Sequence, residues 1–135
     1  MGFSDVFTFG TASRSKFRGV HPELIRVAER AIQMSPVDFG VSEGVREYDR
    51  QVELVEQKKS TTLHSKHLIQ PTGFAHAIDV FAYVNGKSNY TTKYYGPIVQ
   101  AFIEAGTALG IQLRFGHLWK DFTDSVHIEL SEKYY

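Results

Sequence analysis

The stretch "AIDVFAYV" (residues 77–84) is the strongest strand candidate in the chain. It is rich in β-branched and aromatic residues, and the "NGK" that follows it is a typical turn signal. Alternate side chains of a strand face opposite sides, so Asp79 shares a face with residues 77, 81 and 83. Both faces are otherwise apolar, and an aspartate there needs a partner that offsets the cost of its desolvation.

The segments around this strand predict one α+β domain over residues 1–135, in which about three helices pack on a small, mainly antiparallel sheet. Residues 1–20 have no clear period, which indicates an irregular N-terminal arm. Helices are expected in residues 21–36, 47–59 and 93–110, and further short strands in residues 38–46, 111–116 and 126–130.

The helix predictions rest on apolar spacing and on helix-end signals. In the first helix Pro22 suits the first turn, and one apolar stripe is formed by Leu24, Val27, Ala28, Ala31 and Ile32. The second helix is expected to bury Val52 and Val55. The third is expected to end at Gly110, a typical residue after the last helical turn.

Composition restricts the classes of function. At 135 residues and 42% hydrophobic, the chain is long enough for one core and too short for two ordinary domains. A formal net charge of zero argues against broad capture of nucleic acid or of an anionic membrane. There is no cysteine, so any metal site must be built from His, Asp and Glu. No secretory signal or membrane span is recognisable, and we expect a cytosolic product without membrane insertion.

The segment "STTLHSKHLIQPTGFAHAID" (residues 60–79) holds three of the six histidines, His64, His67 and His76, just before Asp79. A catalytic zinc ion typically takes three ligands from His and Asp or Glu and leaves a fourth position for water. It lowers the pKa of that water to about 7, and a nearby carboxylate can accept the proton. The chemistry therefore needs two histidines, one acidic ligand and one spare carboxylate.

A second cluster of the same chemistry lies in "DSVHIEL" (residues 124–130), where His127 occupies a short apolar strand. Asp124 precedes it by three residues and Glu129 follows it by two, and either carboxylate could be the base from this pattern alone. A lone histidine in a strand is more often a core residue with one hydrogen bond, but two such clusters in a small domain favour a metal site. There is no H-E-x-x-H helix and no G-x-S-x-G elbow.

With "SKHLIQPTGFAHAIDVFAY", "LRFG" followed by Trp119, and "DSVHIEL", the chain resembles the zinc peptidases of the D-Ala-D-Ala carboxypeptidase/VanY type. It looks most like the small phage endolysins with L-alanyl-D-glutamate peptidase activity. The resemblance spans roughly residues 20–130 and implies the hedgehog/DD-peptidase-like fold.

Carried over position by position, the resemblance implies that His67, Asp79 and His127 bind Zn²⁺ and that Asp124, rather than Glu129, is the general base. "GVREYDRQ" matches the family pattern G-x-R-x-x-x-x-Q, which makes Arg46 a candidate for binding a substrate carbonyl or carboxylate. The spacing between His67 and Asp79 is longer than is usual in the family, so the position of His67 is also open to His64 or His76.

The resemblance implies a zinc metallopeptidase that cleaves the L-Ala–D-Glu bond in stem peptides of bacterial peptidoglycan. Such an endolysin would accumulate in the host cytoplasm, reach the wall after holin-mediated release, and act as a monomer. Two alternatives remain from the sequence: a D,D-carboxypeptidase of peptidoglycan precursors, and a zinc-containing module that binds the cell wall without catalysis.

Overall fold

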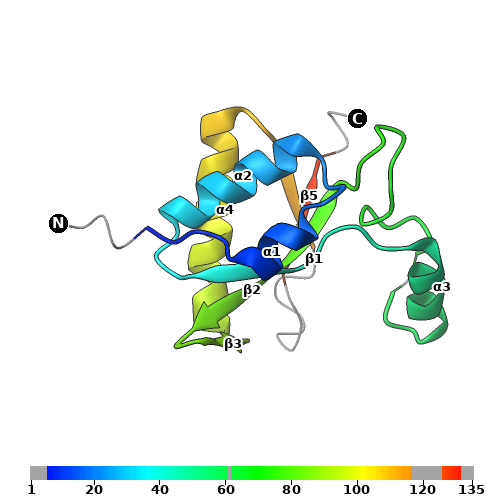
Figure 1. The fold of residues 1–135 in the computed structure, drawn as a ribbon, viewed down its shortest axis with the longest axis horizontal. Helices are drawn as coiled ribbons and strands as arrows, with labels where there is room; N and C mark the ends of the chain where they lie inside the picture. Colours follow the sequence, from blue (N-terminus) through cyan, green and yellow to red (C-terminus); the bar gives the residue numbers. More distant parts are fainter. Residues whose placement is uncertain (1–5, 61, 117–125, 132–135) are drawn as a thin grey trace.

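A computed structural model describes residues 6–60, 62–116 and 126–131. They form an α+β fold in which helices pack on an antiparallel sheet, as the sequence predicts (Figure 1). The elements in chain order are α1 (Thr11–Lys16), α2 (Pro22–Met34), β1 (Phe39–Glu43), α3 (Tyr48–Glu56), β2 (Ala77–Val84), β3 (Lys87–Asn89), the 3₁₀ helix η2 (Thr92–Tyr94), α4 (Tyr95–Leu109), β4 (Leu113–Gly116) and β5 (Val126–Leu130). None of the helices described is long and apolar enough to cross a membrane.

The sheet is organised around β2, which has the bounds predicted from its sequence. The strand order is β1-β2-β5-β4, and β3 pairs with the C-terminal end of β2. The predicted turn after β2 is also confirmed. Asn85 and Gly86 have φ angles of 54° and 78°, the left-handed values that a two-residue hairpin of type I′ requires.

One face of the sheet forms the core with α2 and α4. Ile78, Val80 and Ala82 of β2 are fully buried together with Ile128 of β5. The buried residues of α2 are the predicted stripe, and α4 ends at Gly110 in a left-handed conformation, as expected. The alternate residues of β2 and β5, which include Asp79 and His127, therefore lie on the other face of the sheet.

The expectation of an irregular N-terminal arm is wrong for residues 11–16, which form α1. This helix lies along the outer edge of β1, where the Val41 N–H donates to Ser13 Oγ at 3.0 Å. Phe9 and Phe17 are buried, and the rings of Phe9 and Phe39 lie 5.5 Å apart. The arm thus satisfies a backbone donor on an edge strand that would otherwise be unpaired.

Helix α3 forms as predicted but does not bury the predicted residues. Val52 and Val55 are half-buried, whereas the only fully buried residue of the helix is Gln51. Figure 1 shows α3 standing apart from the layers formed by the sheet, α2 and α4. The attachment of α3 therefore depends on polar contacts more than on an apolar face.

Candidate metal centre

The register of the sheet brings two of the predicted ligands together. Asp79 of β2 is paired directly with His127 of β5, and the same row continues to Glu43 of β1 and Gly116 of β4. Directly paired residues in an antiparallel sheet point to the same face. As a result, His127 Nδ1 lies 3.0 Å from Asp79 Oδ1.

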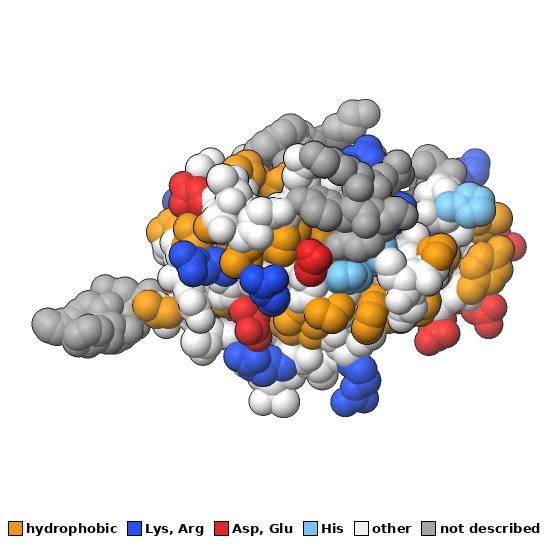
Figure 2. Space-filling model, turned by 90° about the horizontal axis from the view of Figure 1, so that it is seen from above, with side chains coloured by type: hydrophobic (Ala, Val, Ile, Leu, Met, Phe, Trp, Pro, Cys, Tyr) orange, Lys and Arg blue, Asp and Glu red, His pale blue; other side chains and the backbone are white. Residues whose placement is uncertain are grey.

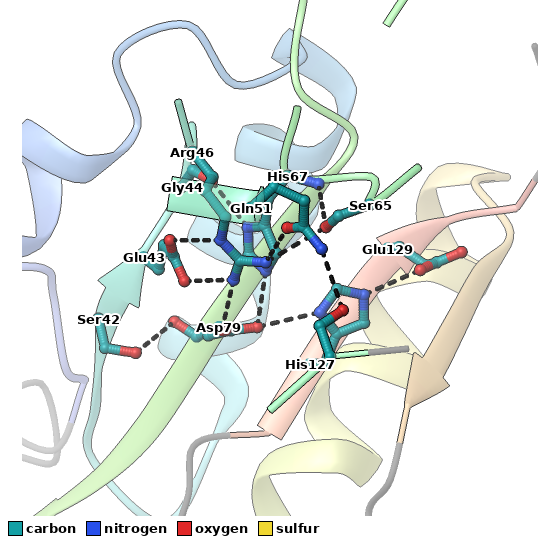
Figure 3. A network of polar contacts seen from close by, with 11 residues as sticks. Ser42, Glu43, Gly44, Arg46, Gln51, Ser65, His67, Asp79, His127 and Glu129 are labelled. Carbon is teal, nitrogen blue, oxygen red and sulfur yellow. Dashed lines mark hydrogen bonds and ion pairs between the residues drawn. The ribbon is translucent and has the colours of Figure 1, made fainter. Parts of the chain in front are cut away.

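The third predicted ligand, His67, comes from the loop between α3 and β2. Its side chain is buried, and its Nε2 lies 3.0 Å from the same oxygen, Asp79 Oδ1. Figure 3 shows His67, Asp79 and His127 directed toward one another from these three segments. One potential ligand atom from each residue lies within 4.8 Å of the other two, so the group could hold a metal ion.

The outer ring nitrogens show which atoms are left for a metal. His67 Nδ1 lies 2.7 Å from the Gly44 carbonyl oxygen, which can only accept, so this nitrogen carries a proton. His127 Nε2 lies 2.8 Å from Glu129 Oε1 and donates in the same way. His67 Nε2 and His127 Nδ1 then face Asp79. Histidines that bind metals are usually held by such an outer hydrogen bond, so the donor set fits a metal ion.

The charges of the group are strongly coupled. Burial alone would raise the pKa of Asp79, but the side chains of His127 and His67 outweigh it and hold this pKa well below its ordinary value. Burial disfavours a charged His127, but Asp79 and Glu129 outweigh it and raise the pKa of His127 to about 9. The pKa of Glu129 is lowered against its burial, chiefly by His127. Without a metal, a proton on His127 therefore supplies the positive charge between two carboxylates.

The structure brings His67, and neither of the alternative histidines, to Asp79. His64 is exposed, whereas His76 is buried with its Nε2 2.6 Å from Thr72 Oγ1 and its ring 5.3 Å from that of His21. Burial, together with the charges of His21 and Lys66, lowers the pKa of His76 to about 4. His76 is thus a neutral buried residue away from the ligand group.

The extra residues between His67 and Asp79 form a loop whose two ends are tied together. The His76 N–H donates to the Lys66 carbonyl at 2.8 Å, and Ile69 and Ala75 form an isolated antiparallel bridge. The insertion therefore projects from the chain between these contacts. It leaves His67 and the start of β2 adjacent, so the longer spacing does not separate the two ligands.

Arg46 lies beside the ligand group and is largely buried. Its Nε and one terminal nitrogen donate to the two carboxylate oxygens of Glu43, at 2.8 and 2.5 Å. The same terminal nitrogen lies 4.0 Å from Asp79 Oδ2. Burial opposes the charge of Arg46, but Glu43 outweighs it and raises the pKa. The assignment of Arg46 to substrate binding stays a prediction.

The structure bears differently on Asp124 and Glu129, the two candidates for the general base. Asp124 lies outside the described residues, so its role stays a prediction. Glu129 engages His127 Nε2, the ring nitrogen that faces away from Asp79. This geometry suits a residue that orients His127, and it disfavours Glu129 as the base.

Sequence reasoning missed three residues that support the ligands: Glu43, Gly44 and Gln51. Gly44 contributes a backbone carbonyl, which no side-chain pattern reveals. Gln51 stands at the last position of the G-x-R-x-x-x-x-Q pattern, and this was the available signal. Its side-chain oxygen accepts a hydrogen bond from Arg46 at 2.7 Å.

The chain matches a known protein family over almost its whole length. The model of a family described as phage L-alanyl-D-glutamate peptidase matches residues 5–135. The chain belongs to this family. Among the peptidases similar to it is the L-alanyl-D-glutamate peptidase of Escherichia phage T5, with 34% identity over 92% of this chain and 98% of the phage T5 protein.

A solved structure supports the same assignment to the peptidase family. The crystal structure of the Serratia marcescens L-Ala D-Glu endopeptidase ChiX is similar with a TM-score of 0.83 and 38% identity. The match covers 98% of this chain and 96% of the ChiX chain. Both relatives thus match over nearly their whole length, and the predicted fold class and family resemblance are confirmed.

The molecular surface carries charges of both signs. Figure 2 shows Lys and Arg side chains interspersed with Asp, Glu and hydrophobic side chains on one face of the molecule. This mixture matches the formal net charge of zero. On the face shown, the described residues offer no single-sign surface that would attract a polyanion at long range.

Proposed function

We propose that this protein is a zinc-dependent peptidase that hydrolyses the L-Ala–D-Glu bond in stem peptides of bacterial peptidoglycan, as a phage endolysin does. The observation that carries the proposal is the convergence of His67 Nε2, Asp79 Oδ1 and His127 Nδ1, with both outer ring nitrogens held by acceptors. The family to which the chain belongs supports the choice of substrate.

Zinc is the metal that this donor set suits best. Two imidazole nitrogens and one carboxylate oxygen form a typical catalytic zinc site, with one position left open for water or substrate. Zinc would supply a Lewis acid that polarises the scissile carbonyl and lowers the pKa of water bound to it. Asp79 contributes a carboxylate that is fully ionised at neutral pH, because its pKa is strongly lowered.

The other side chains would orient groups or move protons. Asp124 would accept a proton from the attacking water and pass it to the amine nitrogen of the leaving D-Glu. Glu129 would hold the His127 ring through its Nε2–H. Arg46 would bind a carbonyl or carboxylate of the stem peptide next to Asp79, from which its guanidinium is 4.0 Å distant.

The proposed setting follows from the same assignment. The enzyme would accumulate in the host cytoplasm as a monomer and reach the peptidoglycan after release through a holin pore.

Mass spectrometry of digested peptidoglycan tests the proposed bond. Purified protein loaded with zinc should release stem peptides that begin with D-Glu and leave L-Ala attached to the muramic acid. Release of free D-Ala, with the L-Ala–D-Glu bond intact, would instead identify a D,D-carboxypeptidase and contradict the proposal.

The variant Asp124→Ala tests the proposed catalytic step. It should keep zinc but lose wall lysis by more than about 100-fold, since general acid–base catalysis typically contributes 10²–10⁴-fold. Asp121→Ala, three residues earlier, is the matched control. Full lysis by Asp124→Ala would refute the assigned base, whereas zinc binding without any lysis by the wild type would indicate a non-catalytic wall-binding module.

A further inference from the structure

Helix α3 has one fully buried side chain, the amide of Gln51. Gln51 is fully buried, whereas Val52, Leu54 and Val55 of the same helix are half-buried. A nine-residue helix is too short to be stable without tertiary contacts. The contacts of Gln51 therefore matter more to this region than those of an ordinary surface glutamine.

The hydrogen bonds of the Gln51 amide connect α3 to residues on both sides of the helix, outside its own bounds. Its Oε1 accepts from Arg46 at 2.7 Å. Its Nε2 donates to Ser60 Oγ at 3.0 Å and to the Thr62 carbonyl oxygen at 2.5 Å. Because Arg46 can only donate and a carbonyl can only accept, the orientation of this amide is fixed by its partners.

Both segments that Gln51 joins lead to His67. The Arg46 N–H donates to the His67 carbonyl at 2.8 Å, and the Arg46 side chain approaches Ser65 Oγ at 3.4 Å. Ser65 Oγ in turn accepts from the His67 N–H at 3.1 Å. On the other side, Thr62 lies five residues before His67 on the same loop. Figure 3 shows Arg46 between Gln51, Glu43 and the loop that carries His67.

His67 has more need of such support than the other two ligands. Asp79 and His127 are fixed by the pairing of β2 with β5, whereas His67 lies on a loop outside the strands. Its position depends on hydrogen bonds to residues 44, 46 and 65. A change in the Arg46 segment is therefore expected to move His67 relative to Asp79.

We propose that Gln51 is a positioning residue for the metal centre: it links Arg46 to Ser60 and Thr62 and so holds the His67 loop against Asp79. This inference rests on the proposed zinc site. It gives α3 a role in metal binding, although no residue of the helix is itself a ligand in the group of His67, Asp79 and His127.

The test compares Gln51→Ala with Gln57→Ala, an exposed glutamine just after the same helix. Zinc affinity is measured by competition with a chromophoric chelator, and amide hydrogen exchange is measured on the metal-free protein by NMR. Outer partners of metal ligands typically contribute 10–100-fold in affinity, and we expect about a tenfold loss for Gln51→Ala. The amides of Arg46 and His67 should exchange faster, while the β2 amides keep their protection. Gln57→Ala should match the wild type.

A second variant, Gln51→Glu, keeps the test valid if Gln51→Ala fails to fold. It retains an acceptor for Arg46 but loses the donors to Ser60 and Thr62, so exchange should rise at residues 60–67 more than at Arg46. The Co²⁺-loaded protein should show an altered visible absorption spectrum in both Gln51 variants, because the position of His67 changes.

The outcomes separate the two proposals. Unchanged zinc affinity and unchanged exchange at His67 in both Gln51 variants, with normal zinc binding by the wild type, would overturn the role of Gln51 alone. Wild-type protein that binds no zinc would overturn the proposed function and, with it, this inference.

Discussion

The metal centre is assembled from two kinds of structure. Asp79 and His127 are neighbours because β2 and β5 pair in one register, which the buried residues on the other face of the sheet hold in place. His67 reaches the same carboxylate oxygen from a long loop through hydrogen bonds to Gly44, Arg46 and Ser65. Hydrophobic burial thus fixes the sheet half of the site, which is Asp79 and His127. Polar contacts fix the loop half, which is His67.

This difference predicts how each half responds to change. A one-residue slip of a strand would move Asp79 to the buried face, which the apolar neighbours Ile78 and Val80 resist. The loop has no such register, and its hydrogen bonds each contribute only about 0.5–1.5 kcal/mol. We therefore expect the sheet half to tolerate distant substitutions better than the loop half.

The largest effect is expected from Asp79→Asn, because Asp79 contacts the histidines of both halves. The variant keeps the shape of the side chain but removes the negative charge. Zinc affinity should fall by more than about 100-fold, beyond the range of outer-sphere partners, and wall lysis should fall with it. Isothermal titration with zinc measures this loss, with the exposed Asp49→Asn as the control. Retained affinity would mean that the two halves do not share this ligand.

The pH dependence of zinc binding tests the sheet half in particular. The proton on His127, whose pKa is raised to about 9, must leave before its Nδ1 can bind a metal. Affinity should therefore rise about tenfold per pH unit between about pH 7 and 9 and then level off.

The metal-free protein should show the opposite trend in stability. The pKa of His127 is higher in the folded than in the unfolded state, so its contribution is complete below about pH 6.5 and lost as the pH rises through about 9. Thermal unfolding across this range, with and without zinc, measures both trends. A zinc affinity that does not change with pH would contradict the assigned protonation of His127.

Removal of Glu129 is expected to weaken zinc binding indirectly, through the orientation of His127. Glu129→Ala leaves His127 Nε2–H without its acceptor at 2.8 Å, so the ring is less well oriented. Zinc affinity should fall about 10–100-fold when measured above the pKa of His127. Chelator competition measures the change, and Glu104→Ala, on the exposed side of α4, is the control. A zinc affinity equal to that of the wild type would mean that Glu129 does not orient His127 for metal binding.

Gly44→Ala disturbs the loop half through the backbone. A Cβ at this position would lie 2.0 Å from the Lys16 carbonyl oxygen and 2.9 Å from Val20 Cγ2, so the segment that holds His67 must shift. We expect a loss of about 1–3 kcal/mol in the free energy of unfolding, measured with urea. Zinc affinity should fall less than in Glu129→Ala.

Gly96→Ala is the matched control for Gly44→Ala, because its Cβ would meet no atom within 4 Å and it lies within α4. It should be neutral or slightly stabilising. If Gly44→Ala is also neutral in its free energy of unfolding, the contact between Gly44 and His67 does not depend on the close approach of Gly44 to Lys16 and Val20.

The sequence predicts the sheet half more completely than the loop half. The β-branched run of residues 77–84 specifies β2, and the apolar alternation around His127 specifies β5. Their direct pairing is a tertiary property that no spacing encodes. The apolar stripe of α2 was predictable because it follows the helical period.

The loop half was less predictable for physical reasons. Three histidines of equal chemistry stand before Asp79, and only the tie between Lys66 and His76 shows that the insertion leaves His67 in place. Gln51 resembles a surface residue in the sequence, since its burial is determined by its polar partners and not by an apolar face. Helix α1 was missed because a six-residue helix has too few residues to show a period.

The most direct test of the metal centre is the zinc content of the wild type, His67→Ala and His64→Ala after dialysis against dilute zinc. The account predicts stoichiometric zinc in the wild type and in His64→Ala, whose side chain is exposed, and little or none in His67→Ala. Stoichiometric zinc in His67→Ala, with loss of zinc in His64→Ala, would contradict it.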